Sequence, residues 1–159
     1  MRWKMKQPTR KFDLEAGRGL LTRAFQSLRK QGFIARQNYL CCGNCAGYAI
    51  ATTVEALPVE KREKVRGTVF YHRQSTEDLV QGGECYLAYG LINTTKYGEV
   101  GLPTAEVGRI AVLTLRECGL EVEWDGDEAK RILVRFPSTP ESVYGLERFV
   151  QEEGMSCVA

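Results

Sequence analysis

The sequence lacks several features that would point directly to a function. Its 159 residues include a single histidine, His72, and its charged side chains nearly cancel, leaving a formal net charge of +2. A charge this small does not predict a nucleic-acid partner. No apolar run is long enough to cross a bilayer, and the polar N-terminal residues do not resemble a signal peptide. We therefore expect no membrane segment and a cytoplasmic location, where thiols stay reduced.

Glycine-rich phosphate-binding loops are also missing. Gly82 and Gly83, and the glycines between positions 98 and 101, lack the spacing of a P-loop or of a dinucleotide-binding fingerprint. The composition is otherwise ordinary for a globular protein, since hydrophobic residues make up 43% and charged residues 26%. The length predicts one domain that buries a substantial core.

The chain divides into three parts by composition. Five basic residues precede Asp13, so residues 1–12 are interpreted as a basic, solvated N-terminal arm. Residues 13–136 are the single predicted α/β domain. Residues 137–159 are a C-terminal extension, which we expect to be helical over 142–153.

Helices are predicted where apolar residues recur at helical spacing between capping residues. Asp13 and Gly32 are the expected ends of the first helix, in which Leu20, Ala24 and Leu28 share one face. Three more helices are expected: one over residues 45–57, a short one capped by Ser75, and one capped by Thr104 that ends before Gly119.

Strands are predicted where residues alternate in polarity or form short apolar runs. The expected strands are residues 33–40, 68–72, 85–92, 120–124 and 131–136. Residues 93–101 are expected to form a polar loop, and Asp125-Gly126 is a hairpin-type turn signal. This order of elements predicts an α/β (α+β) fold, with a single mixed β-sheet of about five strands and helices packed on it.

Cysteines are concentrated in one short segment. Cys41, Cys42 and Cys45 lie within five residues, between a predicted strand and a predicted helix. His72 stands at the end of the strand predicted over 68–72. If these two strands are neighbours, the histidine approaches the cysteines and the four residues form one site.

One interpretation of this site is metal binding. Cys42 and Cys45 have the C-x-x-C spacing that allows two sulfurs to bind one tetrahedral zinc ion, and Cys41 is an alternative to Cys42. His72 would be a third ligand, with Cys85 or a carboxylate completing the set. Structural zinc sites usually contain two cysteine pairs, whereas only one pair is present here.

A second interpretation is thiol catalysis, with Cys42 or Cys45 as the nucleophile and His72 as the general base. A thiolate at a helix N-terminus is stabilised by exposed amides and by the helix dipole, and a nearby imidazole would lower its pKa further. A role in disulfide exchange and a purely structural cysteine cluster are further alternatives.

The segments that carry these residues resemble one protein family. They are residues 31–45, which end in CCGNC, residues 69–74 (VFYHRQ), residues 86–90 (YLAYG) and residues 119–126 (GLEVEWDG). Together they are similar to the signature of an uncharacterised family of bacterial proteins, a domain of unknown function, from the first helix to Phe136. Ala46 departs from the glycine expected after the last cysteine. The resemblance implies no activity, but it implies that Cys41, Cys42, Cys45 and His72 belong to one set.

We therefore expect a soluble α/β protein in which Cys41, Cys42, Cys45 and His72 form a zinc-binding site. Its expected role is to bind or regulate a protein partner, and a small thiol enzyme is the alternative. Neither a nucleic acid nor a membrane is an expected partner.

Overall fold

The computed structural model describes residues 11–139. Its helices are α1 (Leu14–Lys30), α2 (Gly43–Glu55), α3 (Val59–Arg62), α4 (Arg73–Gly82) and α5 (Thr104–Glu117). Its strands are β1 (Phe33–Arg36), β2 (Gly67–Phe70), β3 (Glu84–Gly90), β4 (Ile92–Thr94), β5 (Gly98–Val100), β6 (Glu121–Glu123) and β7 (Ile132–Arg135). The helix predicted over 142–153 and the first ten residues of the predicted N-terminal arm lie outside the described residues.

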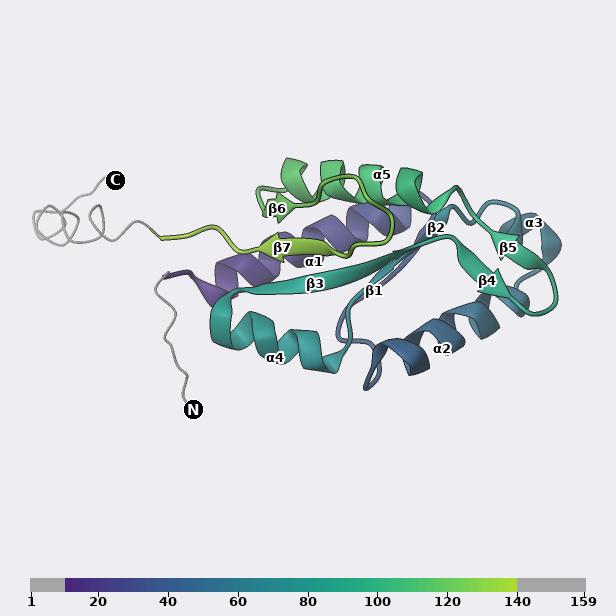
Figure 1. The fold of residues 1–159 in the computed structure, drawn as a ribbon, viewed down its shortest axis with the longest axis horizontal. Coiled ribbons are helices and arrows are strands. Elements are labelled where there is room, and N and C mark those ends of the chain that lie inside the picture. Colours follow the sequence, from purple (N-terminus) through teal and green to yellow (C-terminus); the bar gives the residue numbers. More distant parts are fainter. Residues whose placement is uncertain (1–10, 140–159) are drawn as a thin grey trace, which may run out of the picture.

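Five of these strands form one mixed sheet in the order β1-β2-β3-β7-β6 (Figure 1). β1 and β2 run parallel, with Phe33 opposite Gly67, and the other neighbouring pairs are antiparallel. Parallel pairing needs a long crossover connection, which α2 and α3 supply here. The predicted fold class, a mixed five-stranded sheet with helices packed on it, is confirmed.

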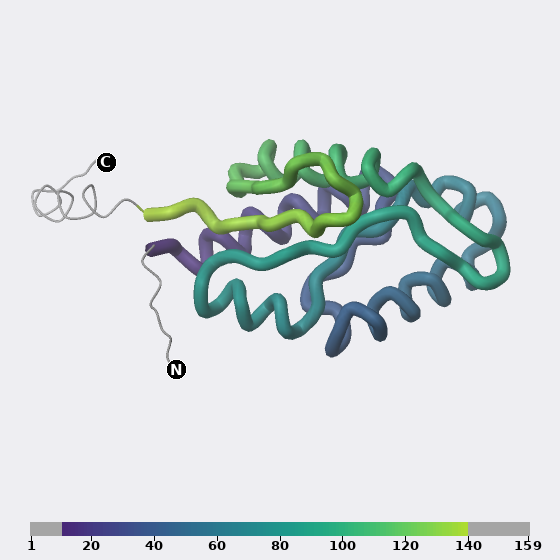
Figure 2. The backbone as a smooth tube through the Cα atoms, in the orientation of Figure 1, coloured from purple at the N-terminus to yellow at the C-terminus, as the bar shows by residue number. Residues whose placement is uncertain are grey.

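The helices cover the two faces of the sheet unequally. Phe25 of α1 and Leu115 of α5 are fully buried in the main core, which includes side chains from all five strands. On the opposite face, Ile50 and Val54 of α2 meet Phe70 in a smaller apolar cluster. Figures 1 and 2 show α5 above β3 and both α2 and α4 below it. The cysteine segment forms the start of α2 and lies outside the main core.

The N-cap predicted for α1 is confirmed, whereas the N-cap predicted for α4 is not. Asp13 caps α1 as predicted, since its carboxylate accepts a hydrogen bond of 3.0 Å from the Ala16 N–H. The cap predicted at Ser75 is wrong, because α4 begins at Arg73 with His72 as its N-cap. The backbone N–H of Ser75 donates to the His72 carbonyl, and the chain is thus already helical at Ser75.

The start of α5 is also corrected by one residue. The helix begins at Thr104, and Pro103 rather than Thr104 is its N-cap. The Thr104 hydroxyl instead accepts a hydrogen bond of 3.3 Å from the Leu91 N–H, which joins the helix to the end of β3. Gly119 follows the helix at φ +96°, as expected of a glycine in the left-handed region.

Two strand predictions are also corrected. β1 ends at Arg36, because Asn38 and Leu40 adopt left-handed backbone angles, φ +51° and +61°, that do not continue a strand. Residues 93–101, predicted as a loop, contribute to the β4–β5 hairpin, in which Ile92 lies opposite Val100. The Glu55 carboxylate of α2 accepts a hydrogen bond of 2.7 Å from the Thr95 N–H and so ties this hairpin to α2.

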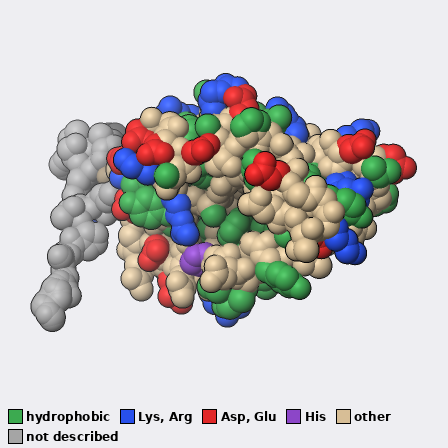
Figure 3. Space-filling model, turned by 45° about the vertical axis from the view of Figure 1, so that its right-hand side comes forward, with side chains coloured by type: hydrophobic (Ala, Val, Ile, Leu, Met, Phe, Trp, Pro, Cys, Tyr) green, Lys and Arg blue, Asp and Glu red, His purple; other side chains and the backbone are tan. Residues whose placement is uncertain are grey.

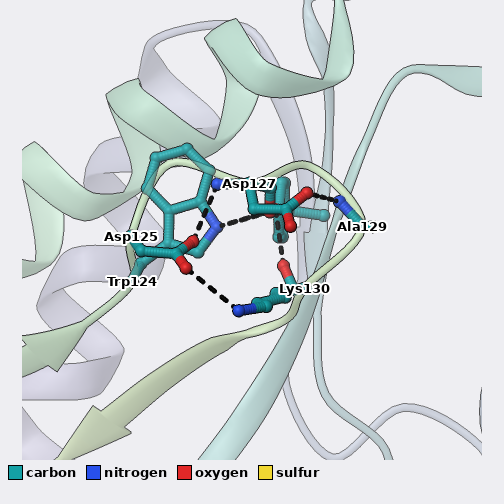
Figure 4. Close-up of polar contacts among 6 residues, drawn as sticks. Trp124, Asp125, Asp127, Ala129 and Lys130 are labelled. Atoms are coloured by element: carbon teal, nitrogen blue, oxygen red, sulfur yellow. Dashed lines mark hydrogen bonds and ion pairs between the residues drawn. The ribbon is translucent and has the colours of Figure 1, made fainter.

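The β6–β7 connection is longer than the tight turn suggested by Asp125-Gly126, although the two strands do pair as predicted. The Tyr89 hydroxyl of β3 accepts a hydrogen bond of 2.8 Å from the Trp124 indole and donates one of 2.6 Å to the Lys130 carbonyl. The Lys130 ammonium lies 3.1 Å from the Asp125 carboxylate (Figure 4). The loop is therefore held against the sheet at both of its ends.

Among residues 11–139, no helix is both long enough and apolar enough to cross a bilayer.

Two glycines of α1 provide a matched test of core packing. A Cβ at Gly17 would overlap the ring of Phe136, whereas a Cβ at Gly19 would meet open space. We expect Gly17→Ala to lower the free energy of unfolding by about 1–3 kcal/mol through overpacking. Gly19→Ala should raise it by up to about 1 kcal/mol, because alanine is the better helix former. Urea unfolding followed by circular dichroism measures both effects, and the same sign for the two variants would contradict this packing.

Candidate functional site

The sulfur atoms of Cys41, Cys42 and Cys45 form a compact group at the surface. All three Sγ atoms lie within 4.8 Å of one another. The Cys41 and Cys45 sulfurs are 3.6 Å apart, and both side chains are exposed, while Cys42 is half-buried. Three thiols at such separations are able to bind a single soft metal ion.

The loop between β1 and α2 brings the cysteines together by running along the start of α4. The Tyr39 N–H donates a hydrogen bond of 2.9 Å to the Tyr71 carbonyl, and the Arg73 N–H donates one of 3.0 Å to the Leu40 carbonyl. These bonds extend the contact between the β1 and β2 segments beyond the ends of the strands. The left-handed angle at Leu40, unfavourable for a branched side chain, then turns the chain into the cysteine segment.

Cys42 is the N-cap of α2, which begins at Gly43, two residues before the helix predicted over residues 45–57. Its backbone is extended, and its carbonyl accepts the first helical hydrogen bond, 3.0 Å from the Ala46 N–H. Cys45 lies in the first turn, on the same side as the N-cap. The helix start therefore fixes the spacing of two of the three sulfurs.

Cys42 and Cys45 differ in their acidity. The backbone N–H of Cys45 lowers the pKa of Cys42, although the Cys42 side chain makes no capping hydrogen bond. Interactions with the Cys41 sulfur, and then with the Cys42 sulfur, raise the pKa of Cys45 to about 11. Cys42 is thus the first of this pair to ionise, and its negative charge holds a proton on Cys45.

His72 lies beside this loop but outside the compact sulfur group. As the N-cap of α4 it sits between Tyr71 and Arg73, the two residues whose backbones bond to Tyr39 and Leu40. Its Nδ1 atom is buried and has no hydrogen-bond partner within residues 11–139. The structure therefore brings the three cysteine sulfurs together, as predicted. The backbone of His72 lies next to the cysteine loop, but its imidazole nitrogens do not belong to the sulfur group.

Cys85, which the sequence offered as another metal ligand, lies in the main core. It is 2% exposed in the main apolar cluster, and burial raises its pKa to about 12. Its thiol is therefore neutral and inaccessible. Cys85 therefore packs as a small apolar residue of the core.

A comparison with known protein families matches residues 11–137 to a domain of unknown function, DUF6891. The chain belongs to this family. No curated protein and no solved structure matches the chain. The DUF6891 match includes the three cysteines, His72 and all of the helices and strands described above.

A cavity of about 510 Å³, which the sequence did not predict, lies between α2 and the sheet of this DUF6891 domain. It begins at Gly43 and Asn44, directly after Cys42, and extends along α2 to Glu55. Figure 3 shows the surface hollowed on this side of the molecule, with hydrophobic side chains inside the hollow. One sequence pattern could have indicated this cavity. Gly43, Gly47 and Ala51 are spaced four residues apart, which places small residues along one face of α2.

The acidity order predicts which DUF6891 thiol reacts first. In metal-free protein near pH 7, we expect iodoacetamide to modify Cys42 faster than Cys45, because only the thiolate is nucleophilic. Cys85 should stay unmodified while the protein is folded. Peptide mass spectrometry after timed quenching measures the three rates, and urea-unfolded chain is the control in which the differences should vanish. Modification of Cys45 before Cys42 would contradict the assigned acidities.

Proposed function

We propose that Cys41, Cys42 and Cys45 bind a zinc ion as thiolates. The observation that carries this proposal is the separation of their sulfurs, all within 4.8 Å of one another. In a tetrahedral site with Zn–S bonds of about 2.3 Å, neighbouring sulfurs are about 3.8 Å apart. The Cys41 and Cys45 sulfurs, at 3.6 Å, need almost no movement to reach that separation.

The charge balance of the cluster favours a bound cation. Without a metal, one thiolate raises the pKa of its neighbour, and Cys45 is expected to remain protonated at neutral pH. A dication reverses this effect, because its charge stabilises several adjacent thiolates and drives off their protons. Metal binding would thus offset the repulsion between thiolates that the short distances between these sulfurs impose.

The proposed fourth ligand is His72. Its support is the buried Nδ1 atom without a partner among the described residues and the hydrogen bonds that hold residues 71–73 against the cysteine loop. A water molecule is the competing fourth ligand, as in zinc sites that have three protein ligands and one open position. Replacing His72 distinguishes the two.

We further infer a binding or regulatory role in a reducing compartment such as the cytoplasm. Cys41 and Cys45 are exposed, so a protein partner has direct access to the metal site.

The second candidate function is thiol catalysis with Cys42 as nucleophile, which is favoured by its lowered pKa. That function predicts a protein that is active without metal.

Zinc content is the direct test. We expect full-length protein purified without chelator to contain one zinc per chain by inductively coupled plasma mass spectrometry. Cys45→Ser should lose the metal, because thiolates supply most of the binding energy. Cys118→Ser is the matched control, since Cys118 is a half-buried thiol at the end of α5 outside the cluster.

The outcomes separate the candidate functions. Retention of full zinc by Cys45→Ser, or absence of zinc from the unmodified protein, would refute the proposal. A large drop in zinc affinity in His72→Ala supports the histidine as the fourth ligand, and unchanged affinity assigns that position to water.

Zinc affinity should also depend on pH. Because the Cys45 pKa is about 11, this thiol is protonated in the free protein at pH 8 and must release its proton on binding. Each released proton weakens apparent binding about tenfold per pH unit of acidification. We therefore expect at least a hundredfold loss of affinity between pH 8 and pH 6, measured by competition with a chromophoric chelator. A pH-independent affinity would mean that the thiol protons are not displaced.

A further inference from the structure

We propose that a polar cavity at the carboxyl ends of β1 and β2 binds a small hydroxy carboxylate. The cavity has a volume of about 210 Å³ and is separate from the cavity beside α2. Its polar lining consists of Arg18, Thr22, Gln37, Asn38, Tyr71 and Thr76. Open α/β sheets commonly bind ligands beyond the carboxyl ends of their parallel strands. The only parallel pair among the described residues, β1 and β2, ends here.

Hydrogen bonds within the cavity wall leave the Tyr71 hydroxyl hydrogen and the Asn38 amide hydrogens unused. The Gln37 amide donates a hydrogen bond of 3.1 Å to the Tyr71 hydroxyl oxygen, so the hydroxyl hydrogen stays available for a ligand. The Thr76 hydroxyl donates one of 2.8 Å to the Asn38 side-chain oxygen, which leaves the Asn38 amide hydrogens. Within residues 11–139, no group accepts a hydrogen bond from either of these donors.

Arg18 supplies the positive charge. No carboxylate among residues 11–139 lies within ion-pair distance of its guanidinium, although Glu106, Asp125, Glu84 and Glu123 all pair with other cations. The guanidinium is near enough to Tyr71 to lower the pKa of that phenol slightly, but burial dominates and raises the pKa. Tyr71 is therefore a neutral donor beside one unpaired cation.

These groups define the ligand class. A single guanidinium with neutral donors around it balances one negative charge, and its planar fork matches a carboxylate. The Gln37 amide oxygen has no donor within the described part of the chain and suits a ligand hydroxyl. Leu79 and Val80 supply an apolar wall, and the volume is below that of pockets for drug-sized ligands. A small carboxylate with a neighbouring hydroxyl matches the charge, the donors, the Gln37 acceptor and the size of this cavity.

The cavity and the cysteine cluster are built from the same loop, since Gln37 and Asn38 precede Cys41 by only a few residues. The inference does not depend on zinc, however, because no cavity-lining residue belongs to the sulfur group. Failure of zinc binding would therefore leave this proposal intact, and the converse also holds.

Lactate is the probe for the test. Full-length, ¹⁵N-labelled, metal-free protein is titrated with sodium lactate, with sodium chloride at equal ionic strength as the salt control. We expect saturable shifts of the Asn38 and Thr76 backbone amides and of the Asn38 side-chain amide. Lactamide, which has the same shape without the charge, should bind at least tenfold more weakly because a neutral amide cannot form the bidentate ion pair that a carboxylate forms with Arg18.

Matched variants assign the binding to the cavity. Arg18→Gln should weaken lactate binding at least tenfold, whereas Arg23→Gln, at another exposed position of α1, should not change it. Tyr71→Phe, which removes only the hydroxyl, should weaken binding about threefold to tenfold. Shifts no larger than those with chloride, or equal binding by the Arg18 and Arg23 variants, would overturn the proposal. Tighter binding of inorganic phosphate at the same amides would overturn the assignment to a carboxylate.

Discussion

The contact between two backbone segments, residues 37–40 and residues 71–73, positions both the cysteine cluster and the polar cavity. Two hydrogen bonds hold it, from Tyr39 to Tyr71 and from Arg73 to Leu40. They continue the parallel pairing of β1 and β2 after both strands have ended. On one side of the contact, the loop delivers Cys41 and Cys42 to the start of α2. On the other side, Gln37, Asn38 and Tyr71 line a polar cavity. Loss of this contact would disperse both groups of side chains.

The cysteine cluster illustrates how local geometry creates a chemical requirement. Placing Cys42 at the N-cap of α2 stabilises its thiolate, but the same geometry places Cys45 where a second negative charge is unfavourable. Folding alone does not resolve this conflict, and a bound dication would. Burial has the opposite effect on Cys85, which stays neutral in the core. Position in the fold, rather than residue type, thus separates the structural cysteine from the candidate ligands.

Much of the fold could be predicted because it depends on local patterns. α1 and α5 have strong apolar periodicity, and the alternation of β6 and β7 identifies a paired edge of the sheet. The end of β1 could not be predicted, because left-handed angles at Asn38 and Leu40 are imposed by the bonds to residues 71–73. The β4–β5 hairpin was missed because its strands have three residues each and are mostly polar. The cysteine cluster was visible in the sequence, whereas the polar cavity combines residues from three distant segments.

X-ray absorption at the zinc edge tests the central claim most directly. The spectrum of zinc-loaded protein reports the elements bonded to the metal and their distances. A site built from Cys41, Cys42 and Cys45 predicts three sulfur neighbours at about 2.3 Å and one lighter neighbour at about 2.0 Å. A shell of oxygen and nitrogen alone, or a single sulfur, would show that the three thiols do not act together and would contradict the account.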